Sequence, residues 1–124
     1  MAKKAEKNSL AQLCPVRNVV ARFGNKWSVL VLLLLEEKGT LRFNEIGRLI
    51  PDISAKVLSS TLRTLEADAL VRRTVYPEVP IRVEYALTPT GQELVPLLQS
   101  LTDWALRNMP SIIRHRQRYE RAGA

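Results

Sequence analysis

The chain of 124 residues has very few of the side chains from which catalytic and metal sites are built. It contains one cysteine, Cys14, and one histidine, His115. These counts cannot supply a zinc ligand set, and no Ser–His–Asp order or glycine-rich phosphate loop is present. Asp52 and Asp68 fit a turn and a helix end better than a catalytic pair, and His115 fits a solvated surface. We therefore expect no enzymatic activity, no cofactor and no metal.

Long apolar runs are also absent. The longest, residues 27–35, is far shorter than the roughly 20 residues of a membrane span, and Lys26 and Glu36 bracket it. Its composition predicts a helix that is buried on nearly all sides. Residues 1–9 are polar and basic, without the apolar core of a signal peptide, and we expect a flexible arm, either simply disordered or in contact with DNA. Together with the single cysteine, these features predict a cytoplasmic protein with no membrane partner.

Acidic residues are scarce relative to basic ones. The chain has 12 Asp and Glu against 19 Lys and Arg, which gives a net charge of +7. A hydrophobic content of 46% is enough for a folded core, and the length predicts one domain, residues 10–124. A small basic domain is typical of proteins that bind a polyanion such as DNA, RNA or an anionic membrane surface.

Two short helices joined by a tight turn are predicted in residues 43–71. Apolar side chains recur at helical spacing through residues 43–49, and Pro51 then ends this helix. Ser54 is a suitable N-cap for a second helix that extends to about Asp68. This arrangement predicts a helix-turn-helix.

The second helix of this pair has one apolar face and one polar face. The apolar face carries Leu58, Leu62 and Leu65. The polar face carries Lys56, Ser59, Ser60, Arg63 and Thr64. Short hydroxyl side chains allow a helix to approach a DNA groove closely, and Arg and Lys reach phosphates or guanine edges. The helix is therefore a candidate recognition helix, although a solvated helix of a small α+β domain would look similar.

Two β-prone segments follow the candidate recognition helix. Residues 71–76 and 81–87 flank the proline-bounded loop 77–80 and predict the two-stranded wing of a winged helix-turn-helix. Val83, Tyr85 and Leu87 share one side of the second strand. Arg82 should therefore point outward, where it would contact a phosphate or the minor groove or remain solvated. The predicted fold class is α+β, mainly α.

Helices are predicted on both sides of this unit. The preceding helix begins near Pro15 and has an apolar stripe of Val16, Val19, Val20 and Phe23. The following helix has Thr88 as its N-cap and a broad apolar stripe that includes Leu97, Leu101 and Trp104. We expect Pro96 to kink it or to mark a late start, and Pro110 to separate it from a last basic helix, residues 111–121. Both stripes are candidate dimer interfaces; alternatively, the terminal stripe covers the domain's own core.

Several motifs carry a resemblance to a known family. They are Cys14–Val16, Lys26–Trp27, Arg42–Phe43, Ile50–Ser54, Leu62–Glu66, Tyr76–Pro80, Arg82–Tyr85, Leu87–Thr88, Gly91 and Trp104. In this order they resemble the HxlR-type winged-helix regulators of bacteria and archaea, relatives of the MarR group. The resemblance covers most of the chain, from Cys14 to Trp104. Departures from the family pattern are Asn25 and Ala69, where glycines are usual, and Ile81, where proline is usual.

The resemblance implies a homodimeric transcriptional regulator, with repression favoured, that binds a pseudo-palindromic operator. Recognition helices would enter successive major grooves, and the wings would lie alongside the flanking backbone or minor groove. The expected DNA-contacting residues are Arg42, Ser54, Lys56, Ser59, Ser60, Arg63, Thr64 and Arg82. The alternative is a winged helix used only for protein–protein contact, which would require a more apolar recognition face. RNA is disfavoured because a helix cannot enter the narrow major groove of A-form RNA.

Cys14 stands where some relatives carry a redox- or electrophile-sensing cysteine. Cys14 comes just before Pro15, at a predicted helix N-terminus. The partial positive charge of a helix N-terminus favours the thiolate and so lowers the pKa of a thiol, and the charge of Arg17 would add to that effect. The alternative is a buried, inert thiol that packs as a small hydrophobic group. Cys14 is thus a candidate redox sensor.

Overall fold

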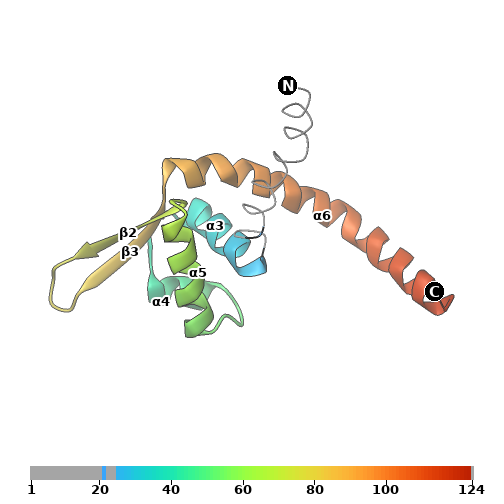
Figure 1. Ribbon diagram of the computed structural model, residues 1–124, viewed down its shortest axis with the longest axis horizontal. Coiled ribbons are helices and arrows are strands. Elements are labelled where there is room, and N and C mark those ends of the chain that lie inside the picture. Colours follow the sequence, from blue (N-terminus) through green and yellow to red (C-terminus); the bar gives the residue numbers. More distant parts are fainter. Residues whose placement is uncertain (1–20, 22–24, 124) are drawn as a thin grey trace, which may run out of the picture.

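The computed structural model describes residue 21 and residues 25–123, which form a small helical body with a hairpin and a long helix extending from it (Figure 1). The elements in chain order are α3 (Lys26–Lys38), β1 (Leu41–Arg42), α4 (Phe43–Leu49), α5 (Ala55–Ala67), β2 (Val71–Tyr76), β3 (Arg82–Leu87) and α6 (Pro89–Arg121). The strands form one antiparallel sheet in the order β1-β3-β2. The predicted fold class, a mainly helical winged helix-turn-helix, is confirmed. No helix in the described part of the chain combines the length and apolar character needed to cross a membrane.

The core lies between α3, the helix-turn-helix pair and the first turns of α6. α3 is the central element, and it contributes Val31, Leu32 and Leu35, all buried. Its first turn is capped by Asn25, whose Oδ1 accepts the N–H of Ser28 at 2.9 Å. Burial of these apolar side chains is the main favourable term that fixes α4 and α5 around α3.

The sheet is a hairpin of β2 and β3 with the two-residue strand β1 added at one edge. In the hairpin Val71 is paired with Leu87 at the base and Tyr76 with Arg82 at the tip. β1 joins through Leu41, which is opposite Tyr85. The sequence did not predict β1, because two residues are too few to show an alternating pattern. The hairpin predictions for residues 71–76 and 81–87 agree with β2 and with β3 to within one residue.

The end of α5 is closed by a backbone motif that usually contains glycine. The N–H of Ala69 donates to the carbonyl of Glu66, and the N–H of Leu70 donates to the carbonyl of Leu65, both at 3.0 Å. This is the hydrogen-bond pattern of a Schellman motif, in which Ala69 is the residue that must be left-handed. Its φ of 62° costs an alanine roughly 1–2 kcal/mol that a glycine would not incur. Ala69 therefore adopts the left-handed conformation that usually calls for glycine.

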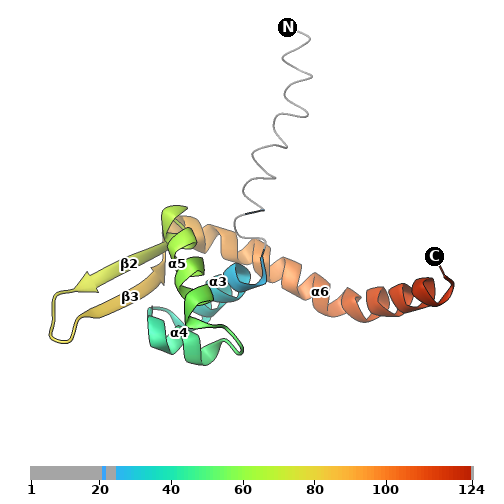
Figure 2. The ribbon, with the colours of Figure 1, turned by 60° about the horizontal axis from the view of Figure 1, so that its bottom comes forward.

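α6 is one continuous helix of 33 residues. Thr88 caps it as predicted, since its Oγ1 accepts the N–H of Gly91 at 3.0 Å. The predicted interruption at Pro110 is wrong, and Pro96 does not mark a late start. Each proline removes one ladder hydrogen bond, but both prolines are solvent-exposed, so water can reach the carbonyls that they leave unpaired. Figures 1 and 2 show the second half of α6 extending well beyond the helical body.

Candidate nucleic-acid interface

α5 presents its polar face to solvent beside the wing. Lys56, Ser60 and Arg63 are exposed along the middle of this face, and Ser59 and Thr64 are half-buried at its borders. The predicted apolar face is confirmed, because Leu58, Leu62 and Leu65 are buried in the core. In Figure 2 α5 lies in front of α3, with the hairpin to its left and α4 at its lower end, and no other described element lies in front of it.

The beginning of α5 is fixed by the turn that joins it to α4. Ile50 closes α4, and Asp52 takes a left-handed conformation with φ of 67°. Ser54 then caps α5, with its Oγ accepting the N–H of Val57 at 3.1 Å. The two helices pack closely, because a Cβ on Gly47 would lie 3.6 Å from Leu58 Cδ2. The orientation of the polar face is therefore set by the core and the turn.

The two cations of this face have no acidic partner among the described residues. Lys56 takes part in no salt bridge there, and Arg63 makes only a long contact of 3.4 Å from Nη2 to Ser59 Oγ. Glu66 is exposed one turn further along α5. The positive charges of Lys56 and Arg63 are therefore free to meet an anion.

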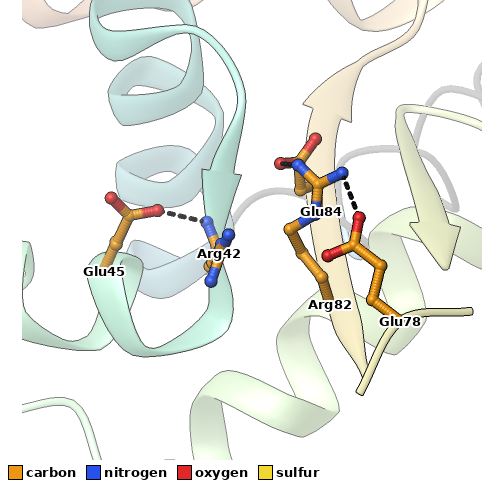
Figure 3. A network of polar contacts seen from close by, with 5 residues as sticks. All are labelled: Arg42, Glu45, Glu78, Arg82 and Glu84. Atoms are coloured by element: carbon orange, nitrogen blue, oxygen red, sulfur yellow. Dashed lines mark hydrogen bonds and ion pairs between the residues drawn. The ribbon is translucent and has the colours of Figure 1, made fainter. Parts of the chain in front are cut away.

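Arg42 lies at the junction of β1 and α4, and its side chain is exposed. Its backbone N–H donates to Glu45 Oε1 at 2.8 Å, which caps the start of α4 (Figure 3). In the sheet it is paired with Glu84 of β3. Arg42 is thus held at the edge of the wing by its main chain, while its guanidinium stays accessible.

Arg82 is less exposed than expected. It ion-pairs with Glu78 and with Glu84 at 2.8 Å each (Figure 3). Its guanidinium lies 3.9 Å from the centre of the Tyr76 ring. The hydrogen bond to Glu78, with the charges of both glutamates, raises the pKa of Arg82 above its ordinary value. Arg82 lies on the same side of β3 as Glu84, the side opposite Val83 and Tyr85 that strand parity predicts. Parity could not show that Glu78, Glu84 and Tyr76 hold the side chain against the hairpin.

Other exposed cations, which were not predicted as site residues, lie on the two elements that flank α5 in the chain. Arg72 and Arg73 are exposed on β2, and Arg48 is exposed in the last turn of α4. All three are visible in the sequence as basic residues next to the predicted recognition helix. Their proximity in the chain was the only signal, and it does not distinguish a DNA-facing arginine from a solvated one.

The candidate dimer residues divide into two groups. Val16, Val19, Val20 and Phe23 lie outside the described residues, as does the redox-sensing candidate Cys14. Leu97, Leu101 and Trp104 lie on α6 and are 68%, 57% and 48% exposed. Further exposed apolar residues continue along the same helix: Leu106, Met109, Ile112, Ile113 and Tyr119.

The first turns of α6 do cover the domain's own core. Val95 and Leu98 are buried there, and Gly91 packs against Leu70. The beginning of α6 thus covers the domain's own core, as the alternative interpretation of this helix predicted. The exposed apolar residues that follow on α6 do not cover that core. No cluster of three or more His, Cys, Asp or Glu side chains that could hold a metal is found in the described ranges.

This fold and this exposed face define a winged helix-turn-helix regulator of the DNA-binding class. Residues 22–113 match the HxlR-like helix-turn-helix family, to which the chain therefore belongs, as the resemblance predicted. An HTH-type transcriptional regulator of Methanothermobacter thermautotrophicus is 50% identical over 92 residues, or 74% of this chain and 70% of that protein. YtfH of Escherichia coli, also an HTH-type transcriptional regulator, is 40% identical over 108 residues, or 87% of this chain and 85% of YtfH.

Solved structures give the same assignment. The redox regulator HypR in its reduced form aligns with a TM-score of 0.74 at 36% identity, covering 81% of this chain and 98% of HypR. Its oxidised form aligns with a TM-score of 0.70 at 39% identity, covering 77% of this chain and 97% of HypR. The likeness thus extends over nearly the whole of a protein described as a redox regulator.

Proposed function

We propose that this protein is a homodimeric transcriptional regulator that binds a pseudo-palindromic operator in double-stranded DNA and acts without catalysis. The observation that carries the proposal is the polar face of α5, which is exposed beside the wing and has two cations without an acidic partner in the described part of the chain. A repressor that blocks a promoter needs only to bind DNA, and the polar face of α5 would be sufficient for that. For this reason we favour repression over activation.

The proposed contacts follow from position along α5. Arg63 is assigned to a guanine edge, where arginine pairs with O6 and N7. Lys56, in the first turn of α5, is assigned to a phosphate. The hydroxyl residues allow close approach: Ser54, Ser59, Ser60 and Thr64. Arg42 is assigned to the backbone beside the wing.

Base reading and phosphate binding are expected to respond differently to mutation. Arg63→Ala should weaken operator binding by roughly 1–3 kcal/mol per subunit and relax specificity at one base pair. Lys56→Ala should weaken binding to all sequences alike and lower the slope of log affinity against log salt by about one. Fluorescence anisotropy with an operator and a scrambled duplex, over a series of salt concentrations, measures both effects.

Arg114→Ala and Lys38→Ala are matched controls, since both residues are exposed and lie on other helices. They should leave affinity and salt slope close to those of the wild type. If Arg63→Ala and Lys56→Ala bound as tightly as these controls, the assigned face would be wrong. Affinity that did not fall with salt would instead favour the protein–protein module, because apolar docking does not release counterions.

Dimerisation is supported by the apolar residues exposed on α6. Leu97, Leu101 and Trp104 lie along a helix that leaves the body of the domain, as seen in Figure 2. Exposed apolar surface of this extent is typical of a protein interface. A symmetric dimer would bury it and would bring two copies of α5 to a symmetric DNA site.

We further propose that Cys14 makes DNA binding responsive to oxidants or electrophiles. The support is the predicted position of Cys14 at a helix N-terminus and the similarity to the redox regulator HypR. With one cysteine in the chain, oxidation gives a sulfenic acid, a mixed disulfide, or a bridge to Cys14 of the partner subunit.

Treatment with diamide should change operator affinity of the wild type and leave Cys14→Ser unaffected, because serine cannot form these products. Anisotropy before and after treatment, followed by dithiothreitol, measures the effect and its reversal. A treated wild type that binds as the untreated protein does would leave Cys14 with a packing role only.

A further inference from the structure

Four side chains contact one another at the loop end of the hairpin. We call them the wing clamp: Tyr76, Glu78, Arg82 and Glu84. Arg82 faces Tyr76 in the last paired position of the β2–β3 ladder. Its Nη2 reaches Glu78 in the loop, and its Nη1 reaches Glu84 on its own strand, both at 2.8 Å (Figure 3). Arg82 therefore ties the loop to the body of the hairpin.

The guanidinium of Arg82 is engaged mainly within the wing clamp. Nη1 and Nη2 are used by the two carboxylates, and Nε is buried. A phosphate that bound Nη1 and Nη2 through the same hydrogens would have to compete with Glu78 and Glu84 for them. The clamp has two carboxylates and one guanidinium, and its net negative charge repels a phosphate.

The loop is also held through its main chain. The N–H of Glu78 donates to the carbonyl of Tyr76 at 2.7 Å, so both the backbone and the side chain of Glu78 are fixed. Beyond this anchor the tip of the wing is uncharged and exposed. Val79, between the exposed prolines Pro77 and Pro80, is fully exposed, and Ile81, directly after Pro80, is 70% exposed.

We propose that Arg82 is a positioning residue that fixes the shape of the wing, and that the apolar tip, through Val79 and Ile81, contacts the minor groove of the operator. This inference rests on the proposed function. We assign the tip to the minor groove because β2 follows α5 directly in the chain, so the wing continues the surface that is proposed to face DNA. Apolar side chains are used in minor grooves, where they pack on sugars and base edges without ion pairs. The wing then contributes affinity that does not depend on salt.

The test uses the full-length protein and a duplex of about 30 base pairs enriched by the wild type from a random-sequence pool. Arg82→Ala, Arg82→Lys and Glu78→Gln should each lower affinity about tenfold, because each opens the clamp and the wing is no longer preorganised. The salt slope should stay that of the wild type. Lysine does not rescue, since an ammonium cannot bridge both carboxylates and stack on Tyr76. Thermal unfolding of each variant checks that the core remains intact.

A phosphate contact by Arg82 predicts a different set of results. Arg82→Ala would lower the salt slope by about 0.9, Arg82→Lys would retain most affinity, and Glu78→Gln would tighten binding by releasing the arginine. That pattern would overturn the positioning role. Failure to enrich any duplex from the pool would instead remove the proposed function, and this inference with it.

The tip is tested separately with Val79→Ser and Ile81→Ser, which keep the charge of the wing. Each should lower affinity about fivefold at low and high salt alike, since the lost contact is apolar. Wild-type affinity in both variants would overturn the minor-groove contact and would make a protein partner the candidate occupant of the tip.

Discussion

Gly91→Ala is expected to destabilise the fold by roughly 3 kcal/mol or more. A Cβ at this position would lie 2.2 Å from the carbonyl oxygen of Leu70, a distance at which the chain must shift. The carbonyl cannot move freely, because it accepts the N–H of Thr88 at 3.1 Å. The Cβ would also approach Leu87 Cδ2 at 3.3 Å. The first turn of α6 would therefore be forced away from the end of α5.

Urea unfolding followed by circular dichroism measures this loss. Gly47→Ala is the matched control, since its Cβ would meet Leu58 at an ordinary contact distance of 3.6 Å within a helix. That variant should be more stable than the wild type by roughly 0.5–1 kcal/mol, the usual advantage of alanine over a helical glycine. Equal stabilities for the two variants would contradict the close contact between α6 and Leu70.

Leu101→Glu is expected to separate the proposed dimer and to weaken operator binding by about a hundredfold or more. Leu101 is 57% exposed on α6, so the substitution leaves the domain's own core intact. In a dimer it would place a carboxylate in an apolar interface without a partner, which costs several kcal/mol. A monomer would bind one half-site at a time and lose the gain of two linked sites, typically a factor of 10²–10⁴.

Sedimentation near micromolar concentration and anisotropy with the operator report the two effects. Gln99→Glu is the control, because it changes the charge of the same helix by the same amount at an exposed polar position. It should remain dimeric and bind DNA. A wild type that sediments as a monomer of 14.1 kDa would contradict the dimer and the palindromic operator together.

The helix-turn-helix could be predicted from sequence because each of its signals is local. The bounds of α4, the Ser54 cap of α5 and the strand β2 follow from apolar spacing, a proline and a capping residue. The division of α5 into a core face and a polar face follows from the same periodicity. Such features depend on residues within one or two turns of each other, and a single sequence contains that information.

Other features depend on contacts between distant parts of the chain. β1 exists because Leu41 meets Tyr85, and Arg82 folds back because Glu78 and Tyr76 surround it. The continuity of α6 through Pro110 depends on solvent reaching the carbonyl that the proline leaves unpaired. A local pattern gives the propensity of a proline to break a helix and does not show how the freed group is satisfied.

Selection of duplexes from a random-sequence pool, followed by footprinting of the enriched duplex, tests the central claim most directly. A dimer that reads DNA through α5 should select an inverted repeat whose half-sites lie one helical turn apart, or a multiple of it, centre to centre, with protection in successive major grooves. Arg63→Ala should lose discrimination at one symmetry-related pair of positions. An enriched site without two-fold symmetry, or a pool with no enrichment at all, would contradict a dimer that reads DNA through α5.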